Sequence, residues 1–205
     1  MKHEDQQQPT FAEALAGGDY HDAGRFEDVD VDRHRLDGHT FEGCAFVSCR
    51  FGEAPLSGAS FISTEFVRCE FLLTKLAGST LNGVTFRECK LVGLHFTECN
   101  RFGFQPAFEG CLIDQCVFQK NTWKKGRFTG DRLRHTDFLE CGLKEATFDD
   151  STFEEVRFEG CDLERADFRR AAGYAIDPAR NRLTKARFSL PEAESFLHFL
   201  GIRLD

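Results

Sequence analysis

Nine cysteines and seven histidines are the residues of this 205-residue chain best suited to chemistry. Thiolates act as nucleophiles or redox centres, and both residue types bind transition metals. The histidines, however, are scattered without metal-ligand spacing. The sequence also contains no Cys-x-x-Cys, no His-Glu-x-x-His, no Gly-x-Ser-x-Gly and no Gly-rich phosphate loop. It therefore predicts a protein that is not an enzyme, with no catalytic residues, no metal site and no cofactor.

All nine cysteines follow one spacing rule, set by a series of large apolar residues with a period of five. The series has 15 consecutive members from Phe26 to Phe96 and 13 more from Phe108 to Phe168. A period of five fits neither the 3.6-residue repeat of a helix nor the alternation of a strand, so it indicates a repeat architecture. The cysteines each stand two residues before a member: Cys44, Cys49, Cys69, Cys89, Cys99, Cys111, Cys116, Cys141 and Cys161.

The other residues at the cysteine position are mostly Ala, Ser, Thr or Gly. A large and a small residue from every five therefore share one interior, where the cysteines serve as small buried side chains. Asn121 and Asp131 are polar exceptions at this position. We expect backbone amides to hold Asp131. A buried catalytic carboxylate is the alternative, but no partner acid, base or metal cluster accompanies it.

Five-residue units such as Cys161-Asp162-Leu163-Glu164-Arg165 and Ala166-Asp167-Phe168-Arg169-Arg170 resemble those of pentapeptide-repeat proteins. The resemblance covers roughly residues 24 to 188. It implies an all-β fold, a right-handed quadrilateral parallel β-helix in which four units make one 20-residue coil, completed by a short C-terminal α-helix.

The charges support a 20-residue coil, because residues n and n+20 would then lie one above the other. Between residues 26 and 96, five charged pairs at this spacing are opposite in sign and none is alike. After residue 108, twelve pairs are opposite and two are alike. On such a coil Cys49, Cys69 and Cys89 would stack. We expect them to stay reduced, with a thiol redox sensor as the alternative.

The chain divides into three parts. Residues 1–18 are a polar tail or a cap on the first coil, and residues 19–188 form the β-helix. Between Phe96 and Phe108 lie two more residues than two units need, so we expect an interruption at 97–107. There Phe102 and Phe104 leave the interior register, either to meet a partner or to fold back on the coil wall.

Residues 189–205 form the third part. Ser189-Leu190-Pro191-Glu192 is a capping box that predicts a helix ending near Gly201. Its apolar residues exceed what one coil end needs, so we expect them to close the last coil and also to form a twofold dimer interface. A monomeric cap is the alternative. The dimer residues are Phe196, Leu197, Phe199, Leu200 and Ile202.

The net charge of −8 disfavours direct nucleic-acid binding. Residues 137–167 hold 11 acids and 3 bases, and each flanking segment, 120–134 and 168–187, carries +5. Ion-pair ladders between coils therefore account for much of this acidic band, although Glu155 and Glu159 have no opposite charge exactly one coil before or after them. The start has no apolar core typical of a signal peptide, and no apolar run could span a bilayer, so we expect a cytoplasmic protein without membrane contact.

The C-terminal run ARFSLPEAESFLHFLGI, after Tyr174-Ala175-Ile176-Asp177, resembles the ends of pentapeptide-repeat proteins that protect type II topoisomerases, the albicidin-resistance and quinolone-resistance (Qnr-like) groups. This resemblance implies a homodimer joined through the helix, which binds DNA gyrase or topoisomerase IV as a mimic of duplex DNA. A cytoplasmic scaffold or regulator with another protein partner is the alternative. The implied partner-binding residues are Glu155, Glu159, Asp149 and Asp150 in the acidic band, with Arg101, Phe102 and Phe104 in the loop.

Overall fold

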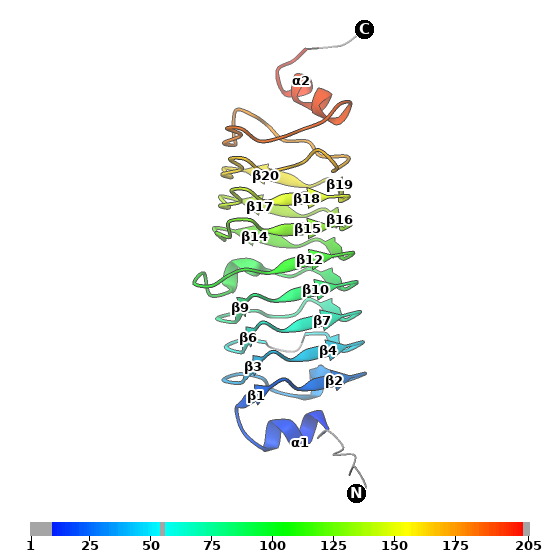
Figure 1. Ribbon diagram of the computed structural model, residues 1–205, viewed down its shortest axis with the longest axis vertical. Coiled ribbons are helices and arrows are strands. Elements are labelled where there is room, and N and C mark those ends of the chain that lie inside the picture. Colours follow the sequence, from blue (N-terminus) through cyan, green and yellow to red (C-terminus); the bar gives the residue numbers. More distant parts are fainter. Residues whose placement is uncertain (1–9, 54–55, 203–205) are drawn as a thin grey trace, which may run out of the picture.

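The computed structural model describes residues 10–53 and 56–202. They form a rod of stacked parallel strands with a helix at each end (Figure 1). The twenty strands of this described part are two or three residues long and fall into four sheets, which we number as faces 1 to 4 in the order in which the chain visits them. The predicted parallel β-solenoid with a short C-terminal helix is confirmed. No helix within the described ranges is long and apolar enough to cross a membrane.

The strands of each face follow one another along the rod. Face 1 contains β1 (Tyr20–Asp22), β3 (Thr40–Glu42), β6 (Ser60–Ile62) and β9 (Thr80–Asn82). Face 2 contains β2 (Arg25–Glu27), β4 (Ala45–Val47), β7 (Glu65–Val67), β10 (Thr85–Arg87), β12 (Ala107–Glu109), β15 (Arg127–Thr129) and β18 (Thr147–Asp149). Face 3 contains β5 (Arg50–Phe51), β8 (Glu70–Leu72), β11 (Lys90–Val92), β13 (Leu112–Asp114), β16 (Arg132–Arg134) and β19 (Thr152–Glu154). Face 4 contains β14 (Val117–Gln119), β17 (Asp137–Leu139) and β20 (Arg157–Glu159).

The register of the strands confirms the 20-residue coil. Phe46 pairs with Phe66, and Phe128 pairs with Phe148. Across the interruption the offset becomes 22, as in the pairing of Phe86 with Phe108. The two extra residues therefore lengthen one coil and leave the stacking on either side intact.

Every member of the five-residue apolar series is buried. On face 2 the phenylalanine rings stack along the rod, with centroids 5.1 Å apart for Phe108 and Phe128 and 4.9 Å apart for Phe128 and Phe148. Rings on neighbouring faces meet edge to face, as Phe128 meets Phe138. Each buried ring contributes on the order of 2 kcal/mol to folding, so the interior column supplies most of the stability.

The small residues of the interior form a second column, and it is polar. The Cys69 thiol donates to the carbonyl oxygen of Phe46 at 3.3 Å, and the Thr64 hydroxyl donates to that of Phe41 at 2.9 Å. Both acceptors lie in the preceding coil. All nine cysteines are buried and free, as expected of small interior side chains. Burial raises the pKa of the Cys99 and Cys116 thiols to about 12.

At the corners, the residue two places after an interior residue takes a left-handed backbone conformation. Glycine is common there, as at Gly130 (φ 65°), but charged residues also adopt it, including Asp150 (φ 55°) and Glu155 (φ 52°). This conformation costs a non-glycine residue some free energy, which the regular hydrogen bonds on both sides offset. Polar corner residues therefore line the edges of the rod.

Helix α1 (Phe11–Ala16) covers the first coil. Thr10 and Glu13 form a capping box at its start, and Phe11 packs on Phe26 with ring centroids 5.0 Å apart. Of the two alternatives for residues 1–18, the described part, from residue 10, is a cap; residues 1–9 lie outside the described ranges. His21 occupies the first interior position of face 1, although the apolar series omits it.

The described residues include three short 3-10 helices. Within the coils are η1 (Val31–Arg33) and η2 (Phe96–Glu98), and η3 (Glu192–Glu194) follows the last coil. Helix α2 (Ser195–Phe199) follows η3 directly. The expected capping box at Ser189 is wrong, because the Ser189 hydroxyl donates instead to the carbonyl oxygen of Arg169 at 2.7 Å in the coil below. Residues 203–205 of the expected C-terminal module lie outside the described ranges.

Candidate functional site

The buried carboxylate of Asp131 is part of the polar interior column. Its side chain is 1% exposed, and its Oδ1 accepts a hydrogen bond from the backbone N–H of Cys111 at 2.7 Å. A backbone amide therefore holds it, as expected. Burial raises the pKa of Asp131 to about 7. Within the described ranges no group of three or more His, Cys, Asp or Glu side chains is arranged to hold a metal ion.

Two histidines that the sequence analysis treated as scattered lie together near the N-terminal end. His21 Nε2 is 2.9 Å from His39 Nδ1, and the rings stack with centroids 5.2 Å apart. Burial, together with the neighbouring His39, lowers the pKa of His21. Because the two facing nitrogens bond to each other, the pair stabilises the first coil. The two histidines stand almost one coil apart in the sequence, and this spacing is the only signal that could have paired them.

The acidic band, residues 137–167, is largely neutralised by ion pairs between coils. Nine of its eleven carboxylates lie within 4 Å of a Lys or Arg nitrogen, and two, Asp149 and Glu155, form no such pair in the part of the chain that the structure describes. Examples at the predicted spacing are Asp137 with Arg157 at 2.8 Å and Glu164 with Lys144 at 3.1 Å. The ladder predicted from the charge pattern therefore forms.

The four predicted acidic site residues differ in their partners. Asp150 pairs with Arg170, whereas Glu155 is 76% exposed and has only His135, at 3.5 Å. The expectation that Glu159 is uncompensated is wrong. Its carboxylate lies 3.3 Å from Arg180 and 3.7 Å from Arg157. Arg180 was missed because it stands one residue beyond a full coil from Glu159, after the last regular strands.

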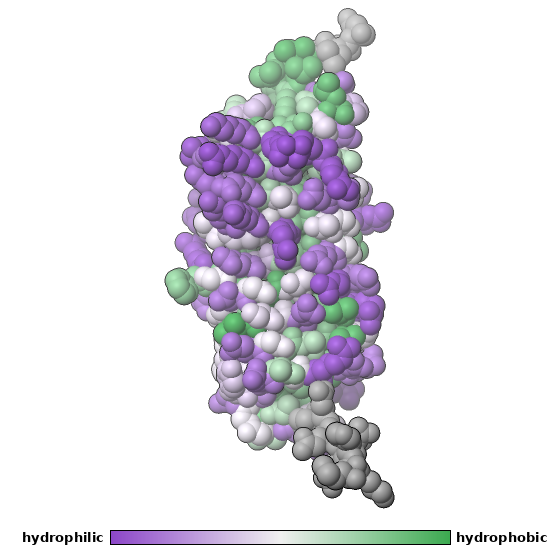
Figure 2. Space-filling view, in the orientation of Figure 1, coloured by the Kyte–Doolittle hydropathy of each residue, from purple (hydrophilic) through white to green (hydrophobic). Residues whose placement is uncertain are grey.

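These acidic residues follow one turn of the chain around the rod. Asp149 ends β18 on face 2, and Asp150 lies at the corner between faces 2 and 3. Glu155 lies at the corner between faces 3 and 4. Glu159 ends β20 on face 4. Hydrophilic side chains gather over these coils on the side of β14, β17 and β20, as Figure 2 shows. The structure therefore brings Glu155 and Glu159 onto one side of the rod.

The interruption at 97–107 protrudes from the corner between faces 4 and 1 (Figure 1). Phe102 is 94% exposed, as a partner-binding side chain would be, and Arg101 is also exposed. Phe104 is 1% exposed and lies edge to face against Trp123, with centroids 4.9 Å apart. Its predicted contact with a partner is therefore wrong: Phe104 fills the interior position of face 1 between Leu81 and Trp123.

The loop and the acidic residues do not form one patch. The corner that carries Phe102 is diagonally opposite the corner that carries Asp150 and follows Asp149, because the chain visits the four faces in order. Glu155 and Glu159 lie nearer the loop, on face 4 or at its edge. A single flat partner surface can therefore reach the loop together with Glu159, but not with Asp149.

The C-terminal apolar residues divide between closing the coil and facing solvent. Phe196 packs on Phe188 with ring centroids 4.7 Å apart, so it covers the last coil, and Leu197 is half-buried. The exposed side chains are Phe199 at 42%, Leu200 at 63%, Ile202 at 51% and Leu190 at 76%, the last of which was not predicted. Figure 2 shows this end of the rod as hydrophobic.

Stacked coils of five-residue units around an apolar column define a four-faced parallel β-solenoid. Because the interior is filled by side chains, only the outer walls and the ends are accessible to a partner. Eight copies of the pentapeptide repeat match the family model between residues 127 and 165. This part of the chain therefore consists of pentapeptide repeats, and the coils before and after it have the same five-residue period.

Two solved structures of trypsin-treated variants of QnrB1, described as a plasmid-mediated fluoroquinolone resistance protein, share the fold. One is 18% identical, with a TM-score of 0.60, and the match covers 91% of this chain and 100% of that one. The other is 19% identical, with a TM-score of 0.56, and the match covers 91% and 90%. HetL, a pentapeptide-repeat protein involved in heterocyst differentiation regulation in Nostoc sp., matches at 14% identity with a TM-score of 0.46, over 86% of this chain and 90% of that one. No curated protein matches the chain.

Proposed function

We propose that this protein binds a type II topoisomerase, DNA gyrase or topoisomerase IV, and protects it from a poison antibiotic by DNA-like contacts, without enzymatic activity of its own. The observation that carries the proposal is the corner carboxylate of Glu155, which is 76% exposed and has no Lys or Arg partner among the described residues. The shared fold of QnrB1, a fluoroquinolone resistance protein, supports the same function.

Local placement of charge has to carry the mimicry, because average charge is too low. One chain has a net charge of −8, whereas duplex DNA carries about one charge per 1.7 Å of helix axis. Ion pairs within the protein neutralise most of the carboxylates of the acidic band. A basic groove that normally holds phosphates would therefore be met by the few free carboxylates, above all Glu155 and Asp149.

The exposed apolar end supports a homodimer. Leu200 and Ile202, with Phe199 and Leu190, would be buried if two rods met end to end about a twofold axis. Such a contact would double the length of the acidic surface and place both copies of Glu155 within a few coils of the centre. The proposed interface keeps Phe199, Leu200 and Ile202 of the five predicted residues and adds Leu190. Phe196 closes its own coil, and Leu197 is half-buried.

The proposal is tested by a supercoiling assay with purified gyrase and a poison such as albicidin or a fluoroquinolone. We expect the protein to restore supercoiling and to capture gyrase in a pull-down. Failure of both would refute the proposal.

A scaffold or regulator with another protein partner is the second candidate, and the exposed Phe102 favours it. A phenylalanine that is 94% exposed on a protruding loop provides a contact independent of charge. The two functions differ in their response to substitution. Under the first, Glu155→Lys removes gyrase binding; under the second, Phe102→Ala removes the partner and Glu155→Lys leaves it bound.

A further inference from the structure

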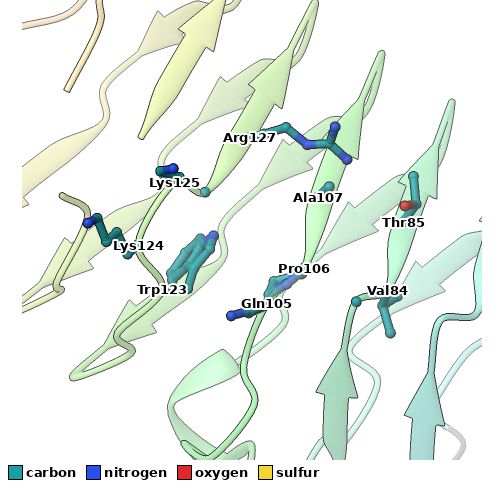
Figure 3. A pocket seen from close by; sticks show the side chains of 11 residues that line it. Val84, Thr85, Gln105, Pro106, Ala107, Trp123, Lys124, Lys125 and Arg127 are labelled. Carbon is teal, nitrogen blue, oxygen red and sulfur yellow. The ribbon is translucent and has the colours of Figure 1, made fainter. Parts of the chain in front are cut away.

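An open hollow of about 200 Å³ lies at the corner between faces 1 and 2, next to the coil of the acidic band that contains Glu145. Three successive rungs line it: residues 83–85, 105–107 and 123–127 (Figure 3). The hollow forms because the residues at this corner include Gly126, which has no side chain, and Pro106, whose side chain is a compact ring. The hollow is smaller than the pockets that hold drug-sized ligands, so it suits an ion or one small chemical group.

The lining of this hollow is cationic in an acidic protein. Lys124, Lys125 and Arg127 line it, and its eleven lining residues include no carboxylate. Lys124 is engaged with Glu145 at 3.0 Å. Lys125 and Arg127 form no ion pair within residues 10–53 and 56–202. The cluster accounts for part of the positive segment 120–134, which the proposed function leaves unused.

A buried donor lies at the same place. Trp123 is 2% exposed, and its indole Nε1 has no hydrogen-bond partner among the described residues. Figure 3 shows the nitrogen end of the ring turned toward the segment from Lys125 to Arg127. A Cβ at residue 126 would stand 2.2 Å from Nε1, so glycine is required there for the indole to reach the corner. Buried N–H groups without a partner are rare in folded proteins, which points to an acceptor that comes from outside the chain.

We propose that the hollow binds a small tetrahedral oxyanion, inorganic phosphate or the phosphate group of a monoester. Arg127 and Lys125 supply the positive charge, and a guanidinium donates to phosphate in a bidentate manner. Thr85 and Gln105 also line the hollow, and their hydroxyl and amide groups can donate hydrogen bonds beside the Trp123 N–H. Every charged group in the lining is a cation, and this selects an anion.

Trp123 is the only tryptophan of the chain, so its intrinsic fluorescence reports on the hollow directly. The full chain is titrated with inorganic phosphate at constant ionic strength, with chloride as the reference, and calorimetry repeats the measurement. We expect a saturable change with phosphate that chloride does not produce. A parallel titration with O-phosphoserine separates the two sources: tighter binding than phosphate assigns the site to a monoester, and equal binding assigns it to the free ion.

The matched variants are Arg127→Gln in the hollow and Arg132→Gln, which removes an exposed arginine from face 3. We expect Arg127→Gln to weaken phosphate binding at least tenfold and Arg132→Gln to change it less than twofold. Trp123→Phe, followed by calorimetry, should also weaken binding, because phenylalanine fills the interior but lacks the N–H. A phosphate response equal to that of chloride, equal binding of acetate, or equal losses in the two arginine variants would overturn the proposal.

Discussion

Asp131 Oδ1 accepts the backbone N–H of Cys111 at 2.7 Å, so a carboxylate occupies a position at which cysteine, threonine and asparagine donate hydrogen bonds. Asn121 at the equivalent position donates to the carbonyl of Phe96 at 3.0 Å. An ionised carboxylate can accept but not donate, and Asp131 Oδ2 has no partner among the described residues. Burial of this carboxylate raises its pKa to about 7.

We therefore expect Asp131→Asn to stabilise the protein at pH 8. The folded-state pKa of Asp131 lies above its unfolded value of 3.8, so the folded state holds the proton more tightly and wild-type stability falls as pH rises from about 4 to 7. The loss is at most about 4 kcal/mol, at 1.36 kcal/mol per pKa unit. Urea unfolding at pH 5 and pH 8 should show the larger gain at pH 8. A gain from Asp131→Asn that is the same at pH 5 and pH 8 would contradict this explanation.

Alanine substitutions of the two phenylalanines in the interrupted coil should have different effects on the free energy of unfolding. Phe104→Ala leaves a cavity beside Trp123 and should cost about 3–5 kcal/mol of the free energy of unfolding. Phe102→Ala removes a side chain that is 94% exposed and should change stability by no more than about 0.5 kcal/mol. Thermal unfolding of the two variants measures the difference. Equal effects would mean that the loop packs differently from this structure.

Charge reversal should affect topoisomerase protection unequally. Glu155→Lys replaces an uncompensated carboxylate, and we expect at least a tenfold loss in the supercoiling rescue assay. Glu159→Lys should lose less, because Arg180 and Arg157 already neutralise that carboxylate. Glu88→Lys is the control, since Glu88 is also an exposed corner residue in the left-handed conformation (φ 54°) but lies in an earlier coil. A similar loss from all three variants would show that total charge, not position, governs binding.

The exposed C-terminal side chains should control the oligomeric state. Leu200→Asp should convert a dimer to a monomer in size-exclusion chromatography with light scattering, with little change in thermal stability. Leu72→Asp on the side wall, where Leu72 is 43% exposed, should leave the mass unchanged. Phe196→Ala should lower stability because it uncovers Phe188. If the wild-type protein has the mass of a single chain, the proposed interface does not form in solution.

The thiols should be unreactive while the protein is folded. All nine are buried, so a reagent in solution cannot reach them while the protein is folded. Burial also raises the pKa of Cys99 and Cys116 to about 12, so these two thiols are not ionised at neutral pH. Mass spectrometry after iodoacetamide treatment should find no alkylation under native conditions and nine modifications in denaturant. Rapid native modification of any thiol would instead support the redox-sensor alternative.

Sequence alone predicted the coil because the same constraint recurs in every unit. A ring such as Phe128 must pack against its equivalents in the coils before and after it, so one regular series determines register, burial and the inward direction of the cysteines. Charge pairs such as Asp137 with Arg157 confirmed the same spacing independently. Local periodicity therefore predicted a repeat architecture, and the resemblance to pentapeptide-repeat proteins supplied the four-sided coil.

The failures lie where that periodicity is interrupted. From Phe96 to Phe108 the chain takes one step of eight residues and one of four, and only packing against Trp123 selects Phe104 over Phe102 for the interior. Arg180 reaches Glu159 from a turn rather than from a strand, so the 20-residue rule does not find it. The cationic hollow depends on the absence of a side chain at Gly126. The sequence does not show that this glycine lies against the indole of Trp123.

The two ends of the rod are not equivalent, and this limits the stoichiometry of any assembly. At one end Phe11 of α1 is buried against the first coil, so no large apolar ring of that helix is left for a neighbour. At the other end Leu200 and Ile202 remain in contact with water. If two molecules associate through the second end, as proposed, the exposed apolar surfaces of both are buried in the pair, and this contact by itself adds no third molecule.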